Sequence, residues 1–179
     1  SVDYNIPDDT LRKIILADSL KFILRPNTLF DRNNLDLARQ NITDRLRQQG
    51  YYAFNKEYIT FTADTTASSK AVELTMNVMP PYPGRVKYYE HHQPFYIRHV
   101  YVVTDYDPSQ RIDLTNYIEE EGDYHKGLRI INSDDKYLRR RIIEENCFIK
   151  PGEKYNSADV DRTYQSFGRL GILNFININ

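Results

Sequence analysis

The sequence predicts an α+β chain of two similar units in series, each a small three-stranded sheet with two helices on one face in the order β-α-α-β-β. Three observations lead to this prediction. A short motif occurs twice, its polar runs have helical spacing of apolar residues, and strictly alternating residues follow the first copy. A duplicated unit implies modules in series, which shapes every functional interpretation.

The repeated motif is a proline-led turn, a polar helical run, and a glycine followed by apolar residues. The last part aligns at an offset smaller by about four residues, or one helical turn, so the helix is one turn longer in the first copy. The matched positions are Pro26, Phe30, Asp31 and Leu35 with Pro151, Tyr155, Asn156 and Val160, and Gly50, Tyr51 and Phe54 with Gly171, Ile172 and Phe175.

In the first unit, alternating residues indicate a strand that ends before Pro7, and Asp8 is suited to cap the helix that follows. Asp31 is suited to cap a second helix, and Gly50 stands where a left-handed residue ends many helices. The predicted inner faces carry Leu11, Ile14, Ile15 and Phe22 in the first helix, and Leu35, Ala38, Ile42 and Leu46 in the second.

Two strands follow, each with one apolar face, as expected for a sheet covered on one side only. A polar loop over residues 64–70 joins them as a hairpin. The apolar positions are Ile59, Phe61 and Ala63 in the first strand, alternating with Tyr58, Thr60 and Thr62, and Val72, Leu74, Met76 and Val78 in the second.

Several prolines then predict a linker, so we expect a first domain over residues 1–84, a linker over 85–94 and a second domain over 95–179. The second domain is expected to carry a long insertion at about residues 105–135, with a strand at Leu128–Ile131. Its other predicted elements are a strand over 95–104, a helix over 137–145 with Leu138 and Ile142 inward, a helix over 157–169, and a truncated final strand.

Composition narrows the function. The 179 residues are 40% hydrophobic and 27% charged, which is typical of a folded chain, and the net charge of −1 argues against wholesale binding to nucleic acid or anionic lipid. Fifteen Tyr and no Trp favour half-exposed sheets and interfaces. No apolar run reaches the ~18 residues of a membrane helix.

Residue types that often form catalytic or metal sites occur in this chain, but their spacing does not match such sites. The histidines lack zinc-site spacing, the carboxylates lack a calcium-loop pattern, and the serines lack a nucleophile-elbow context. Cys147 is expected to be buried rather than nucleophilic. We therefore predict no catalytic residue, no metal, no cofactor and no enzyme activity. The other residues considered are His91, His92, His99, His125, Asp134, Asp135, residues 119–121, Ser68 and Ser69.

A KH-like nucleic-acid-binding protein is one alternative, because residues 168–171 have the G-x-x-G spacing that clamps a nucleic-acid backbone. In KH domains that loop joins two helices, whereas here it is expected to run from a helix into a strand. The first copy of the motif also has Arg47 in place of the first glycine. With the net charge, this predicts no nucleic-acid partner.

The repeated motif consists of a helix pair joined by a turn that ends in Phe-Asp or Tyr-Asn, followed by Gly-[Tyr/Ile]-x-x-Phe and a hairpin. This arrangement resembles POTRA (polypeptide-transport-associated) domains of the BamA/TamA outer-membrane assembly family. Residues 30–59 and 137–164 look most like the TamL-type lipoprotein branch. The resemblance implies tandem POTRA-like units in the periplasm, attached to the bacterial outer membrane through parts absent from this chain. The implied partners are unfolded outer-membrane protein clients, neighbouring POTRA domains or assembly subunits.

An exposed edge strand can accept an incoming strand through main-chain hydrogen bonds with little dependence on sequence. In the POTRA pattern the strand before the hairpin loop lies at the sheet edge. The alternatives are that these residues only complete the sheet, or that the chain is a structural spacer between membrane anchor and barrel. The predicted contact residues are Tyr58, Ile59, Thr60, Phe61 and Thr62, with Arg39 and Tyr51 beside them.

Overall fold

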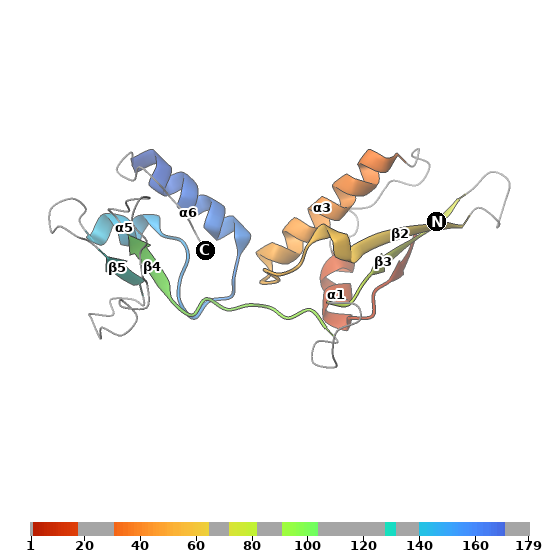
Figure 1. Cartoon of the computed structure of the whole chain (residues 1–179), viewed down its shortest axis with the longest axis horizontal. Helices are drawn as coiled ribbons and strands as arrows, with labels where there is room; N and C mark the ends of the chain where they lie inside the picture. Colours follow the sequence, from red (N-terminus) through yellow and green to blue (C-terminus); the bar gives the residue numbers. More distant parts are fainter. Residues whose placement is uncertain are drawn as a thin grey trace, which may run out of the picture. The chain divides into compact units, whose positions relative to one another are not determined.

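The computed structural model divides the chain into two compact units, Ser1–Pro94 and Phe95–Asn179. Both combine helices with small sheets, so the predicted α+β class is confirmed (Figure 1). The predicted hairpin loop, most of the insertion and the final strand lie outside the described residues. The structure describes residues 2–17, 31–64, 72–81, 91–103, 128–131 and 140–170.

The sheet of the first unit has the strand order β1-β3-β2. β1 runs parallel to β3, and β2 runs antiparallel to it, so the three-stranded sheet is confirmed with β3 at its centre. The described elements of this unit are β1 (Val2–Asn5), α1 (Asp9–Ala17), α3 (Arg32–Gln48), the 3-10 helix η1 (Lys56–Tyr58), β2 (Ile59–Asp64) and β3 (Glu73–Val78).

α1 and α3 begin at the predicted caps. The Asp8 carboxylate accepts from the amides of Thr10 and Leu11 at 2.9 and 3.0 Å, and Asp31 accepts from the amide of Asn33 at 3.2 Å. These carboxylates satisfy amides that have no partner within the helix.

α3 ends at the predicted glycine. Gly50 has a φ of 102°, in the left-handed region that favours glycine. The amide of Tyr51 donates to the carbonyl of Leu46 at 3.1 Å, and the amide of Gly50 donates to the carbonyl of Arg47 at 3.4 Å. This pair of bonds is a Schellman motif, which places the residue after the glycine against the last turn of the helix.

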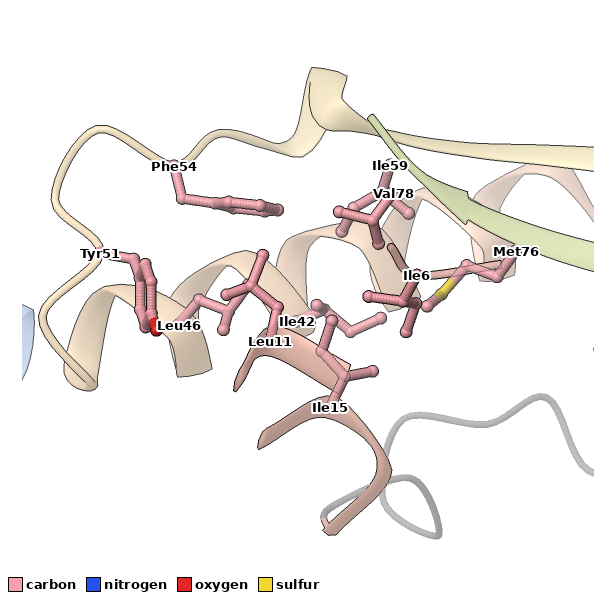
Figure 2. Close-up of a cluster of buried hydrophobic side chains, with 10 residues drawn as sticks. All are labelled: Ile6, Leu11, Ile15, Ile42, Leu46, Tyr51, Phe54, Ile59, Met76 and Val78. Carbon is pink, nitrogen blue, oxygen red and sulfur yellow. The ribbon is translucent and has the colours of Figure 1, made fainter. Parts of the chain in front are cut away.

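The core of the first unit lies between α1, α3 and one face of the sheet (Figure 2). The alternating pattern of the strands puts their apolar residues on this face, as the sequence predicted. Of the predicted helix positions, Ile14 and Leu35 are only half-buried, and Phe22 lies outside the described residues. The buried cluster consists of Ile6, Leu11, Ile15, Ile42, Leu46, Tyr51, Phe54, Ile59, Met76 and Val78.

Within its described residues, the second unit contains a parallel strand pair and two helices. β4 (Val100–Val103) pairs with β5 (Leu128–Ile131), which lies where the insertion was expected to hold a strand. β4 begins five residues later than predicted, at Val100 rather than at residue 95, because the preceding segment bonds to a turn instead of a strand. The helices are α5 (Arg140–Asn146) and α6 (Ser157–Leu170).

A separate small core holds the second unit together, with Ile143 and Phe167 facing Val102 and Leu128. Ile143 is fully buried and Ile142 is half-buried, so Ile142 is not the fully inward position of α5 that the sequence predicted. A helix this short packs on few neighbours, and the tertiary contacts decide which of two adjacent isoleucines is covered.

The start of α6 repeats the start of α3. Asn156 accepts from the amide of Ala158 at 2.9 Å, as Asp31 accepts from the amide of Asn33. The two copies of the motif therefore place the same kind of cap at the same point.

Candidate polypeptide-docking edge

β2 is the edge strand of the first sheet. It pairs with β3 on one side, from Ile59 opposite Val78 to Asp64 opposite Glu73, and within the described residues no strand pairs with its other side. An edge strand presents N–H and C=O groups with which another extended chain can pair. The topology therefore places the predicted contact strand at an accessible position in the sheet.

The hydrogen-bond register determines which main-chain groups face outward. The amide of Met79 donates to the carbonyl of Tyr58 at 2.8 Å, and extending the register by one position puts these residues opposite each other. Hydrogen-bonded and non-hydrogen-bonded pairs alternate along antiparallel strands, so Thr60 and Thr62 direct their main-chain groups at β3. The residues whose main-chain groups point away from β3 are Ile59, Phe61 and Ala63. The amide of Ile59 already donates to the carbonyl of Lys56 in η1, so Phe61 and Ala63 supply the outward amides.

The side chains along this edge differ between the two faces of the sheet. Ile59 is fully buried and Phe61 packs partly against the core, whereas Thr60 and Thr62 are exposed. On the exposed face, the side-chain amide of Asn77 donates to the Thr62 hydroxyl at 3.2 Å. A strand added here would meet the small polar side chains of Thr60 and Thr62 on this face.

The predicted contact residue Arg39 binds within the unit. Its Nε donates to the carbonyl of Lys56 at 3.1 Å, and its Nη2 lies 3.2 Å from a Glu57 carboxylate oxygen. Lys56 in turn pairs with Asp36 at 3.1 Å. Exposed ion pairs contribute little stability alone, but a network holds its members in one geometry. Arg39 therefore fixes η1 onto α3 and so positions the start of β2.

The predicted contact residue Tyr51 lies in the core. Its side chain is 4% exposed, and Figure 2 shows it beside Leu46. The Schellman motif explains this burial, because the residue after the left-handed glycine commonly contacts the last helical turn. Tyr51 thus presents almost no side-chain surface to a partner. Ile59 is also fully buried, and its amide donates to the carbonyl of Lys56.

Sequence reasoning passed over one member of the edge, Ala63. Its main chain faces outward and its side chain is exposed. The period-two pattern that linked Ile59 and Phe61 already included Ala63, so this signal was available in the sequence.

The described residues contain no group of three or more His, Cys, Asp or Glu side chains that could hold a metal ion. Cys147 is buried, as predicted, and burial raises the pKa of its thiol. Gly168 lies inside α6. The glycine-rich loop of a KH domain lies between two helices, so this position does not match the KH alternative.

The sequence of the first unit matches a known protein family. Residues 3–80 match the family described as POTRA, surface antigen variable number repeat. The first unit is similar to a POTRA domain. This match extends from β1 through the end of β3 and includes the whole candidate edge. The similarity to the TamL-type branch stays a prediction.

One solved structure similar to the chain is the crystal structure of Haemophilus influenzae BamA POTRA3-5, with 13% sequence identity and a TM-score of 0.48. The alignment covers 98% of this chain and 50% of that one, so the chain spans half the length of the structure it matches. No curated protein matches the sequence. Among the described helices, none combines the length and the apolarity needed to cross a bilayer.

Proposed function

We propose that this chain is a non-enzymatic, periplasmic polypeptide-binding module of an outer-membrane protein assembly or translocation factor. Two findings support the proposal: the match of residues 3–80 to the POTRA family, and the outer side of β2, with which none of the described strands pairs. The observation that carries it is the outward direction of the main-chain N–H and C=O groups of Phe61 and Ala63. The proposed partners are unfolded outer-membrane proteins, or a neighbouring POTRA domain.

Binding occurs by strand addition. An incoming extended segment pairs with the outward N–H and C=O groups of β2, which gives affinity with little dependence on sequence. Each hydrogen bond contributes about 0.5–1.5 kcal/mol net, and ordering the client offsets part of the sum. The resulting complex is weak and reversible, as a carrier that must release many different clients requires.

The test is a nuclear magnetic resonance titration with a synthetic peptide of about ten residues that alternates apolar and polar residues like a strand of an outer-membrane barrel. The variant is Ala63→Pro, because proline removes an outward N–H and is tolerated on edge strands. Positions 60 and 62 are unsuitable for proline, because their N–H groups face β3. The matched control is Ala63→Val, which changes the exposed side chain at the same position and keeps the outward N–H.

We expect the peptide to perturb the β2 amides, and we expect Ala63→Pro to weaken binding by about two- to tenfold, equivalent to one hydrogen bond. Ala63→Val should bind as the unchanged protein does. Equal affinity of Ala63→Pro and the unchanged protein, or perturbations confined to other elements, would exclude β2 as the docking edge.

A further inference from the structure

The end of the predicted linker is bound to the first unit through His92. Its side chain is 9% exposed, and its ring packs edge-on against the rings of Phe54 and Tyr58, with centroids 4.8 and 4.7 Å away. Its Nε2 lies 3.0 Å from the carbonyl of Met79, a residue 13 positions earlier in the chain. His92 therefore occupies an aromatic notch at the end of the β2–β3 pair.

The main-chain bonding at this point explains why a donor is needed there. The amide of Met79 donates to Tyr58, but the amide of Tyr58 donates to Asn55 at 3.2 Å rather than to Met79. The carbonyl of Met79 is thus left without its usual ladder partner, and His92 supplies it. A carbonyl only accepts, so the imidazole carries its proton on Nε2.

The second unit holds the chain again only a few residues later. The amide of Tyr155 donates to the carbonyl of Phe95 at 2.9 Å, and the amide of Ile97 donates to the carbonyl of Glu153 at 2.8 Å. Gly152 returns a bond of 2.7 Å to the carbonyl of Ile97. The segment that starts at Phe95 is therefore fastened to the turn between α5 and α6.

We propose that His92 is a latch that fastens the linker end to the first unit and confines the free joint between the two units to Gln93 and Pro94. A joint of two residues has few rotatable main-chain bonds, and the proline ring fixes one of them. When His92 leaves its notch, the joint becomes longer and the two units reorient more independently. This device does not depend on client binding.

The latch weakens as the pH falls. Burial lowers the pKa of His92, and the hydrogen bond to the carbonyl of Met79 and the neighbouring Asp8 carboxylate oppose this effect only in part. His91, with Nδ1 3.8 Å from an Asp8 oxygen, and the phenol of Tyr58 are the other titratable groups beside it. The undocked imidazole binds protons more readily than the docked one, so docking is complete above a pH of about 6.5 and declines below it.

The test is ¹⁵N relaxation of the whole chain, which reports how independently the two units tumble. In His92→Ala, we expect the rotational correlation times of both units to fall towards those of separate domains. The matched control is His91→Ala, whose side chain is 56% exposed and which should tumble as the unchanged protein does. Preserved amide shifts in β2 and β3 would verify that the first unit remains folded.

A second variant separates packing from titration. His92→Phe keeps an aromatic ring in the notch but loses the bond to Met79 and the titrating group. Lowering the pH from about 7.5 to about 5.5 should shorten the correlation times of the unchanged protein, because protonation opposes burial, and should leave those of His92→Phe constant. Unchanged relaxation in His92→Ala, or the same pH response in His92→Phe, would overturn the proposal.

Discussion

Two buried threonines with one apparent role should respond differently to the same substitution. The hydroxyl of Thr43 in α3 donates to the carbonyl of Arg39 at 2.8 Å, and the hydroxyl of Thr163 in α6 donates to the carbonyl of Asp159 at 2.7 Å. Their exposed fractions are 3% and 1%. Only Thr163 is also seen to accept a hydrogen bond, from the amide of Phe148 at 3.0 Å.

Valine replaces each hydroxyl with a methyl group of similar size. In Thr163→Val, the part-buried amide of Phe148 loses its partner, and leaving such a donor unsatisfied costs about 1–3 kcal/mol. In Thr43→Val, the carbonyl of Arg39 remains in the helix ladder, so the expected change in unfolding free energy is within about 0.5 kcal/mol. Thr163→Ser keeps the hydroxyl and should recover most of the loss.

The assay is urea unfolding followed by amide signals within each unit, because one global signal would mix two transitions. Signals from α6 should report a clear loss of stability in Thr163→Val, while signals from α3 should be almost unchanged in Thr43→Val. Equal effects of the two substitutions would refute the reasoning. They would show that the hydrogen bond from the amide of Phe148 to the hydroxyl of Thr163 does not stabilise the packing of α6 on the chain after α5.

Three further changes test the first unit by urea unfolding. Leu46→Ala removes a fully buried side chain from the core and should cost about 2–5 kcal/mol; a loss below about 1 kcal/mol would contradict the packing in Figure 2. Gly50→Ala forces a side chain into the left-handed region and should cost about 1–2 kcal/mol, whereas a neutral result would contradict the helix end. Asp31→Ala removes the N-cap of α3 and should cost about 1 kcal/mol, and no loss would show that the cap is dispensable.

The sequence predicted the features that depend on local chemistry. Asp31 and Gly50 mark where α3 begins and ends, because caps and left-handed glycines act on their immediate neighbours. The alternation around Ile59 placed one face of β2 on the core, because successive side chains in a strand point to opposite faces.

Contacts between residues that are far apart in the sequence could not be predicted from local patterns. The sequence predicted that Arg39 would contact a client. The structure shows that its guanidinium is bonded to Lys56 and Glu57, which lie 17 and 18 residues later in the chain. His92 looked like a linker residue because nothing in the local pattern relates it to Met79. The burial of Tyr51 was accessible, since Gly50 already indicated a Schellman motif.

The most direct test of the proposed docking edge is amide hydrogen exchange along β2, measured with and without the barrel-strand peptide. In the free protein, Thr60 and Thr62 should exchange slowly, because their amides bond to β3, while Phe61 and Ala63 exchange fast. Added peptide should slow Phe61 and Ala63. Slow exchange at these two positions in the free protein, or no slowing at a saturating peptide concentration, would contradict the account.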